Sequence, residues 1–346
     1  ADQNGKQKRI SETVKGTKKE AEKLLRDRLS AIENGFHVDK SKQTVSEFLD
    51  HWFDTYVATN CTLRTASGYQ GNVKRYIKPA IGSVAIQSLT PSQIQKVYAG
   101  MLERGLSQTT VLHTHRVLRE ALCHAVKWGI LARNVADAVS PPRREQKVME
   151  MWNIPTIHDF IDLCDGSRYG DVFQFAIHTG MRRSEICGLK WESVDLMEGR
   201  LSVERTLHSI NGQGLVEGLP KTKRSRRNIA LAPETVQLLH SIRGSQMEQG
   251  LPTNGEGYVF TRTSGLPLVP QEVTKAFHGF VEQNNLPPLT FHGLRHANAT
   301  LQLAAGINPK VVSEGLGHSN ISITLDLYSH VLPNMQQHAA EAVANL

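Results

Sequence analysis

The sequence predicts a mainly α-helical protein with a small antiparallel β-sheet, divided into a helical domain and a mixed α+β domain. At 346 residues the chain is too long for one ordinary core, so two or three domains are expected. Apolar residues recur at helical spacing through 44–140. Two short segments rich in Val, Ile, Leu and Thr, 199–207 and 225–231, interrupt the later helical pattern and predict strands.

The first 43 residues are polar and basic, with eleven Lys and Arg against seven Asp and Glu. Thr17 is placed to cap a helix that runs to about Asn34, with Glu20 completing a capping box and Gly35 ending the helix. Residues 6–14 can form a short basic strand. We therefore treat 1–43 as a separate region with a linker helix.

Residues 44–140 predict a domain of four or five helices. Val45, Phe48 and Trp52 show the helical spacing, and Thr90 and Ser107 each precede a helical stretch as N-caps. Two prolines followed by charged residues then indicate a linker over 141–150. The mixed domain occupies 151–346, and its last segment, 334–346, predicts an Ala-rich helix.

Composition points to an acidic partner. The formal net charge is +7, and nucleic acid is the commonest partner of such a chain, although many basic proteins bind none. The four cysteines are scattered without a CxxC pair, which favours reduced thiols in the cytoplasm. No signal peptide or apolar run of transmembrane length is visible, so no membrane partner is expected.

The segment Thr179–Leu189 carries the first candidate site. Gly180 permits a tight turn, and Arg182 is expected in the first turn of the following helix, where free amides and the helix dipole favour an anion. Glu185 can support the same turn. An ordinary surface helix with an Arg–Glu pair would give the same pattern.

Two further candidates follow in the chain. The run Lys221–Arg227 is basic at five of seven positions and is expected to form a β-turn between the two strands, although a solvated charged loop would look alike. His292, Arg295 and His296 share one helical face. A zinc site is disfavoured there because the His-Glu-x-x-His pattern and a cluster of acidic residues are missing, and a structural role is the other reading.

The segment 316–331 contains Leu-Gly-His-Ser followed by Tyr328, a tyrosine that would by itself be read as a core residue. Together, however, the ordered motifs TGxRxxE, HxxRH and LGHS…Y resemble the tyrosine recombinase/integrase family. The resemblance runs from about residue 44 to the end and is similar in look to phage and conjugative-transposon integrases. Residues 1–40 resemble the end of the arm-type DNA-binding domain of such integrases.

The resemblance implies a site-specific DNA recombinase that cleaves and rejoins strands through a 3′-phosphotyrosyl intermediate. Arginines are suited to hold the nonbridging phosphate oxygens because each donates parallel hydrogen bonds and keeps its charge. Tyrosine needs a proton acceptor, since its ordinary pKa is near 10. The implied catalytic residues are Arg182 and Arg295 on the phosphate, His292 and His318 beside it, Tyr328 as nucleophile, and Lys221, with Lys223 as second choice, as the acid for the leaving oxygen.

The implied partner is double-stranded DNA, clamped between the two domains by a protein that forms a tetramer on its attachment sites. An excisionase or a host DNA-bending protein is a further candidate partner, and no metal or other cofactor is expected. Each candidate DNA contact could equally be a solvated charge or a phosphate contact without sequence information. These candidates are Arg64, Lys74, Thr110, His113, Arg116, Arg119, Lys223 and Arg224.

Two other functions fit the same residues. A relaxing enzyme like a type IB topoisomerase would use the same nucleophile and phosphate-binding groups. A DNA-binding protein without catalytic activity is the second alternative, and the complete set of six catalytic residue types argues against it. The separate helical domain and the region before it favour a recombinase, encoded by a bacterium or a phage.

Overall fold

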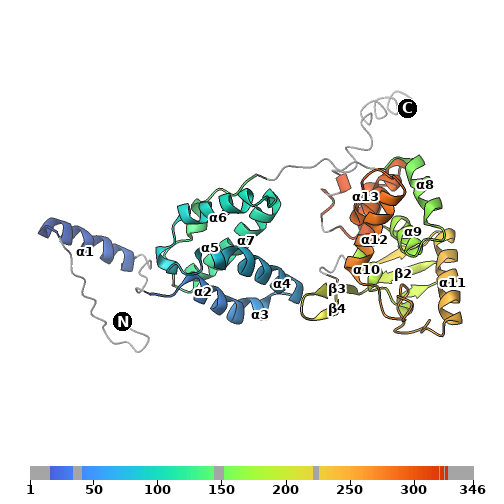
Figure 1. Ribbon diagram of the computed structural model, residues 1–346, viewed down its shortest axis with the longest axis horizontal. Coiled ribbons are helices and arrows are strands. Elements are labelled where there is room, and N and C mark those ends of the chain that lie inside the picture. The colour runs from blue at the N-terminus through green and yellow to red at the C-terminus, as the bar shows by residue number, and fades with distance from the viewer. Residues whose placement is uncertain are drawn as a thin grey trace, which may run out of the picture. The chain divides into compact units, whose positions relative to one another are not determined.

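The computed structural model describes residues 16–33, 41–143, 152–220, 226–318, 320–322 and 324–325. The chain forms two compact units, 1–146 and 147–346 (Figure 1). Several predicted features lie outside the described residues: the strand at 6–14, most of the linker at 141–150, and the helix at 334–346. The same holds for Lys221, Lys223, Arg224 and Tyr328.

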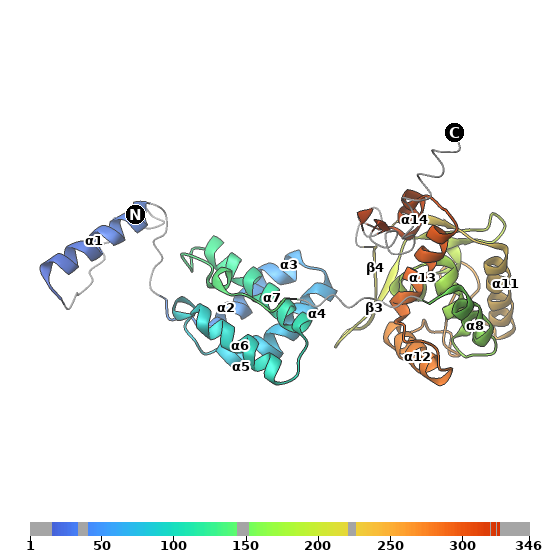
Figure 2. The ribbon, with the colours of Figure 1, turned by 90° about the horizontal axis from the view of Figure 1, so that it is seen from above.

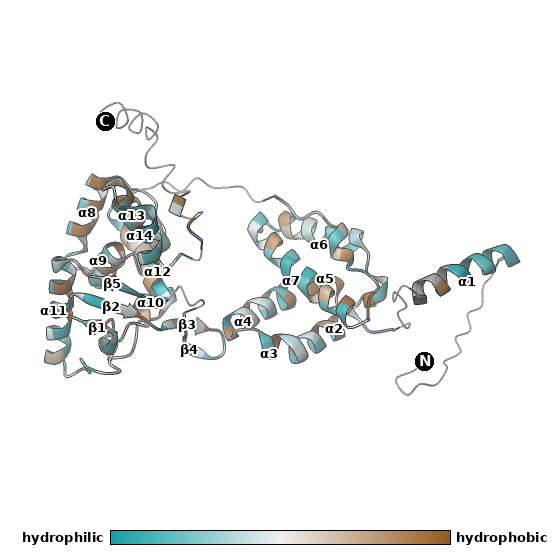
Figure 3. Cartoon of the chain, turned by 180° about the vertical axis from the view of Figure 1, so that it is seen from behind, coloured by the Kyte–Doolittle hydropathy of each residue, from teal (hydrophilic) through white to brown (hydrophobic). Residues whose placement is uncertain are grey.

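Helix α1, Lys18–Glu33, is mostly hydrophilic (Figure 3). It begins as the sequence predicts, because the backbone N–H of Thr17 donates to Glu20 Oε2 at 2.7 Å. The Thr17 hydroxyl donates to the same oxygen at 3.0 Å. The Glu20 side chain therefore satisfies polar groups that would otherwise lack partners at the start of the helix.

Residues 41–143 form a helical bundle, as predicted. Its elements are α2 Val45–Trp52, η1 Phe53–Val57, α3 Ala58–Asn60, α4 Leu63–Asn72, η2 Val73–Ile77, α5 Lys78–Ile81, η3 Ile86–Ser88, α6 Pro91–Glu103, α7 Gln108–Lys127 and η4 Val135–Ala138. The predicted caps at Thr90 and Ser107 are confirmed, since their hydroxyls accept the N–H groups of Gln93 and Thr110.

The bundle core contains large buried side chains and polar groups that are hydrogen-bonded in pairs. Trp52 and Tyr98 are almost fully buried. The Trp52 indole N–H donates to Nδ1 of His124 at 3.1 Å, and the Tyr98 hydroxyl lies 3.0 Å from Nδ1 of His115. Because a buried polar group without a partner costs free energy, these pairs let both histidines lie inside the bundle.

The second unit contains seven α-helices among its described residues, together with one 3₁₀ turn and five strands. The helices and the turn are α8 Ile154–Cys164, α9 Gly170–Thr179, α10 Arg183–Cys187, η5 Trp191–Ser193, α11 Pro233–Glu248, α12 Pro270–Gln283, α13 Phe291–Ala304 and α14 Pro309–Leu316. The strands are β1 Val194–Asp195, β2 Arg200–Val203, β3 Thr206–Ile210, β4 Gly214–Gly218 and β5 Arg227–Ala230. Figure 2 shows α8 and α11 near the side of the unit opposite the β3–β4 hairpin.

The strands form two small antiparallel sheets. One has the order β1-β2-β5, with Leu201 opposite Ile229, and the other is the β3–β4 hairpin. The prediction of one strand over 199–207 is wrong. Residues 200–203 pair with β5 in the first sheet, whereas β3 begins at Thr206 and pairs with β4. Arg205, between the two strands, forms an ion pair with Glu192. The basic run 221–227 therefore follows β4, a strand that the sequence did not predict.

The core of the second unit is rich in aromatic side chains. Phe277 on α12 lies within 5.2–6.3 Å, between ring centroids, of Trp152, Phe160, Phe173 and Phe291. These rings come from helices or turns that are far apart in sequence, so their contacts fix α8, α9, α12 and α13 against one another. None of the helices in the described part of the chain is both long and apolar enough to span a membrane.

We expect Phe277→Ala to lower the free energy of unfolding by about 3–5 kcal/mol, because Phe277 is 1% exposed and its removal leaves a cavity between four rings. Urea unfolding followed by circular dichroism measures this change. Met197→Ala is the control, since Met197 is 98% exposed and its truncation should change stability by no more than about 0.5 kcal/mol. Equal midpoints for the two variants would contradict the assigned core.

Candidate active site

The turn between α9 and α10 carries Arg182, whose side chain reaches the C-terminal end of α14. Gly180 ends α9 with φ of 60°, a conformation that favours glycine. A Cβ atom there would lie 2.5 Å from Leu316 Cδ2 and 2.6 Å from Asn298 Oδ1. The predicted turn is therefore confirmed. Arg182 itself is the N-cap of α10 with extended backbone, so it precedes the first helical turn rather than lying within it.

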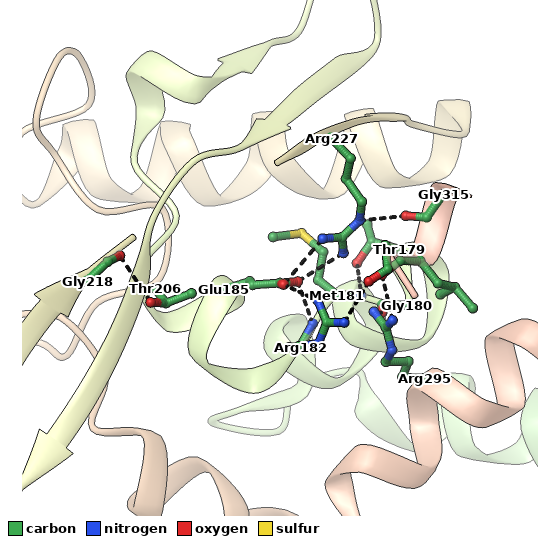
Figure 4. Close-up of polar contacts among 12 residues, drawn as sticks. Thr179, Gly180, Met181, Arg182, Glu185, Thr206, Gly218, Arg227, Arg295 and Gly315 are labelled. Atoms are coloured by element: carbon green, nitrogen blue, oxygen red, sulfur yellow. Dashed lines mark hydrogen bonds and ion pairs between the residues drawn. The ribbon is translucent and has the colours of Figure 1, made fainter. Parts of the chain in front are cut away.

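The Glu185 carboxylate is the buried acceptor at this turn, with 2% of the residue exposed. Its Oε2 accepts the backbone N–H of Arg182 at 2.9 Å and Nη2 of Arg227 at 2.9 Å. Its Oε1 accepts Nη1 of Arg182 at 2.7 Å and Nη1 of Arg227 at 3.2 Å (Figure 4). Burial opposes the charge of Glu185, but the hydrogen bond and charge of Arg227 and the charge of Arg182 outweigh it and hold its pKa below the usual value.

Three arginines donate to three successive carbonyls at the C-terminal end of α14. Arg227 Nε reaches the carbonyl of Gly315 at 2.6 Å, Arg295 Nη2 that of Leu316 at 2.5 Å, and Arg182 Nη2 that of Gly317 at 2.8 Å. The last carbonyls of a helix lack partners within it and form the negative end of its dipole. This helix end therefore orients the three guanidinium groups, and its negative charge offsets part of their mutual repulsion.

Arg295 comes from α13 and is 2% exposed. Its Nη1 donates to the carbonyl of Gly180 at 2.8 Å, across the turn that carries Arg182. Burial, and then the charges of Arg182 and Arg227, lower its pKa to about 9, so it keeps its charge at neutral pH. A guanidinium has five N–H donors, and the contacts above use two from the side chain of Arg182 and two from Arg295. Within the described part of the chain, these contacts leave further N–H groups of both side chains for an anion.

The cluster has an excess of positive charge. Arg182, Arg227 and Arg295 are cations, and Glu185 is the anion that these described contacts bring to them, which leaves a net charge of +2. Two positive charges at low exposure attract an anion strongly, because neighbouring protein atoms screen them less than water does.

Two histidines adjoin these arginines. His292, in the first turn of α13, keeps an exposed edge and packs against His296 with ring centroids 4.9 Å apart. Desolvation by the surrounding protein, and then the charges of His296, Arg295 and Arg182, lower the pKa of His292 to about 4. His318 follows Gly317, and its Nδ1 lies 2.8 Å from the hydroxyl of buried Thr324.

Burial, and then the charges of Arg295 and Arg182, likewise lower the pKa of His318 to about 4. Both rings are therefore neutral at pH 7 and can accept a proton or a hydrogen bond. Within the described residues, no group of three or more His, Cys, Asp or Glu side chains could hold a metal ion.

The structure thus brings together four of the six predicted catalytic residues: Arg182 from the turn before α10, His292 and Arg295 from α13, and His318 from just beyond the C-cap of α14. Lys221 lies in the chain between β4 and β5, and Tyr328 is ten residues beyond His318 in sequence. Neither belongs to the described residues, so their place in the site remains a prediction.

The candidate DNA contacts of the helical unit are mostly exposed. Along α7, His113, Arg116 and Arg119 are exposed at three-residue steps, as predicted, while Thr110 is half-buried and its backbone N–H binds the Ser107 cap. Arg119 also forms an ion pair with Asp137 at 2.7 Å. Arg64 on α4 and Lys74 on η2 are exposed as well.

Sequence reasoning did not single out Arg227, although it lies within the basic run. One signal could have found it. Arg227 and Ile229 share a face of β5, because side chains alternate along a strand, and Ile229 is buried. A cation on an inward face needs a counter-charge, and Glu185 supplies it.

A mainly helical domain with two small antiparallel sheets, in which two arginines and two neutral histidines lie together, has the architecture of the catalytic domain of a tyrosine recombinase. The chain belongs to the phage integrase family: residues 147–335 match the model of that family, and residues 44–102 match the phage integrase N-terminal SAM-like domain. It is a tyrosine-type site-specific DNA recombinase, as the motifs predicted.

Known proteins support this assignment over nearly the whole chain. The chain is 31% identical to a XerC-like tyrosine recombinase of Caldanaerobacter subterraneus, over 100% of this chain and 94% of the relative. It is 26% identical to the ICEBs1 integrase of Bacillus subtilis, over 96% and 91% of the two chains. The Tn1549 transposon integrase, solved with a circular intermediate DNA, matches with a TM-score of 0.75 and 25% identity, over 87% and 99%.

We expect the His292 and His318 side chains to titrate near pH 4 in the DNA-free protein, well below the ordinary pKa of histidine near 6.5. Between these pH values the unfolded chain binds more protons than the folded chain, so the free energy of unfolding falls as the pH decreases from 6.5 to 4. NMR of ¹³C-labelled histidines measures the titrations, with His318→Asn assigning one signal and reducing the slope. A His318 signal that titrates at or above 6.5 would contradict this electrostatic description.

Proposed function

We propose that Arg182 and Arg295 hold a scissile DNA phosphodiester while Tyr328 attacks its phosphorus. The observation that carries this proposal is the net charge of +2 on a cluster in which Arg295 is buried and Arg182 is partly exposed, with guanidinium donors that the described residues leave available. A phosphodiester carries one negative charge, and a second develops on its oxygens as the nucleophile adds. Fixed cations that match the later charge stabilise the transition state more than the ground state, which lowers the barrier.

The two neutral histidines are suited to the first step, in which the tyrosine loses its proton and attacks the phosphate. The Tyr328 hydroxyl must lose its proton as its oxygen bonds to phosphorus, and its ordinary pKa near 10 makes an acceptor useful. His292 is the proposed acceptor, because its low pKa keeps the ring unprotonated at pH 7. The proposed part of His318 is a hydrogen bond to the phosphate, from a ring oriented by Thr324.

The proposed step forms one bond and breaks another. The Tyr328 oxygen bonds to phosphorus, the bond from phosphorus to the 5′-oxygen breaks, and Lys221 gives that oxygen a proton. A 3′-phosphotyrosyl link and a free 5′-hydroxyl result. Attack by another 5′-hydroxyl reverses the step and releases the tyrosine, so strands are exchanged without net consumption of a phosphodiester.

The helical unit is the proposed second half of a DNA clamp, with exposed Arg64, Lys74, His113 and Arg116 facing the phosphates. Lys223 and Arg224 would add contacts beside the scissile position. Recombination of two duplexes breaks four strands, and each chain carries one nucleophile, so the proposed assembly is a tetramer on paired attachment sites. The proposed setting is bacterial cytoplasm, where an excisionase or a DNA-bending host protein would set the direction.

We expect Tyr328→Phe to abolish covalent protein–DNA adducts on a nicked suicide substrate while leaving DNA affinity nearly unchanged, because the variant lacks only the attacking oxygen. Denaturing gels detect the adduct and gel-shift assays measure the affinity. Persistent adducts in this variant would assign the nucleophile elsewhere. For the native protein, incubation with two duplexes bearing attachment sites should give recombinants, and relaxation without recombinants would contradict a recombinase.

We expect Lys221→Ala to slow cleavage by at least about 100-fold, a typical effect of losing a general acid. The loss should be much smaller on a substrate whose 5′-bridging oxygen is replaced by sulfur, because a thiolate leaves without a proton. Lys223→Ala is the matched control and should behave alike on both substrates. Equal defects of Lys221→Ala on both substrates would move the acid role to another residue.

A further inference from the structure

Arg227 is a third arginine in the cluster, with a side chain that is 6% exposed. It faces the same carboxylate as Arg182: both of its terminal nitrogens donate to Glu185, at 3.2 and 2.9 Å. Its Nε donates to the carbonyl of Gly315 at 2.6 Å, so the contacts of the guanidinium point it at the protein (Figure 4). Arg182 and Arg295 are the proposed phosphate-binding residues, whereas the described contacts of Arg227 are with Glu185 and Gly315.

The position of Glu185 poses an electrostatic problem. Glu185 holds Arg182 in place through two hydrogen bonds, at 2.9 and 2.7 Å. A buried carboxylate that paired with Arg182 alone would also cancel most of the charge that Arg182 presents to a phosphate. The contact that orients Arg182 would then also neutralise it, and the lost charge would weaken the attraction for the phosphate that the orientation serves.

We propose that Arg227 is a positioning residue that compensates the charge of Glu185, so that Glu185 orients Arg182 without cancelling its attraction for the phosphate. This inference rests on the proposed binding of the scissile phosphate by Arg182. With Arg227 present the group carries +2, and without it the group carries +1. Arg227 acts through Glu185 and does not itself touch the DNA.

The fold holds Arg227 in this role from two sides. In β5, Arg227 pairs with Val203 of β2, and its side chain shares the inward face of the buried Ile229. The Gly315 carbonyl fixes the guanidinium edge that Glu185 does not occupy. Because the side chains of Arg227 and Glu185 are only 6% and 1% exposed, water screens their interaction weakly, and the charge of Arg227 acts strongly on Glu185.

The first test is Arg227→Met, which removes the charge and keeps an unbranched apolar side chain. We expect cleavage of a phosphodiester suicide substrate to slow by about 100-fold, in the range for one lost cation in such a site. A methylphosphonate at the scissile position is neutral in the ground state and develops only one negative charge as the tyrosine oxygen adds, so it depends less on the positive charge of the site. On that substrate we expect the variant to differ from the native protein by less than about threefold, whereas a merely structural defect would slow both substrates equally.

The second test removes both partners. Glu185→Gln combined with Arg227→Met restores the net charge of +2, and the glutamine oxygen can still accept a hydrogen bond from Arg182. We expect the double variant to cleave the phosphodiester at least about fivefold faster than Arg227→Met alone. Arg227→Lys keeps the charge and should lie between the native protein and Arg227→Met; this variant also serves if Arg227→Met does not fold.

Arg200 and Asp195 provide the matched control, because they form an exposed arginine–carboxylate pair at 3.4 Å in the same sheet. Arg200→Met, with or without Asp195→Asn, should leave both cleavage rates unchanged. The inference is overturned if Arg227→Met slows both substrates equally, slows neither, or is not improved by Glu185→Gln. Failure of the proposed function would look different: native protein would form no adduct, or Tyr328→Phe would retain one.

Discussion

The buried Glu185 carboxylate is the interaction on which the active site depends. Four hydrogen bonds converge on it, one from the backbone N–H of Arg182, one from the Arg182 side chain and two from the Arg227 side chain. The carboxylate of Glu185, with 2% of the residue exposed, stays ionised because its interactions with Arg182 and Arg227 outweigh the cost of burying its charge. The same pairing joins the turn after α9 to the small sheet. Removal of either charge would therefore break this contact and change the net charge that the site presents.

The end of α14 extends this network across the unit. Three successive carbonyls, of Gly315, Leu316 and Gly317, each accept one arginine, so a helix dipole offsets the mutual repulsion of three cations. His318 follows immediately, and the excess positive charge around it keeps the ring neutral. The arginines and histidines are thus electrostatically coupled. The negative charge of a bound phosphate would offset the charges of the arginines and raise the pKa of both histidines.

Local signals in the sequence predicted local structure well. The caps at Thr90 and Ser107 and the glycine turn at Gly180 were visible because each depends on residues within three or four positions. The strands were harder. The segment 199–207 has uniform strand-forming composition, but its two halves pair with different partners, 227–230 and 214–218. Partner choice is a non-local property, and composition does not record it.

The sequence by itself determined the family and the class of enzyme, because its ordered motifs resemble those of tyrosine recombinases and the family match over residues 147–335 confirms the resemblance. It also determined the division into a helical part and a mixed part, through the period of its apolar residues. Only the tertiary structure decided which charged side chains lie in contact with one another. Arg227 and Glu185 are 42 positions apart, and their contact arises from the register of β5 against β2 and the packing of α14. Electrostatic coupling depends on distance and burial in space, and neither follows from positions along the chain.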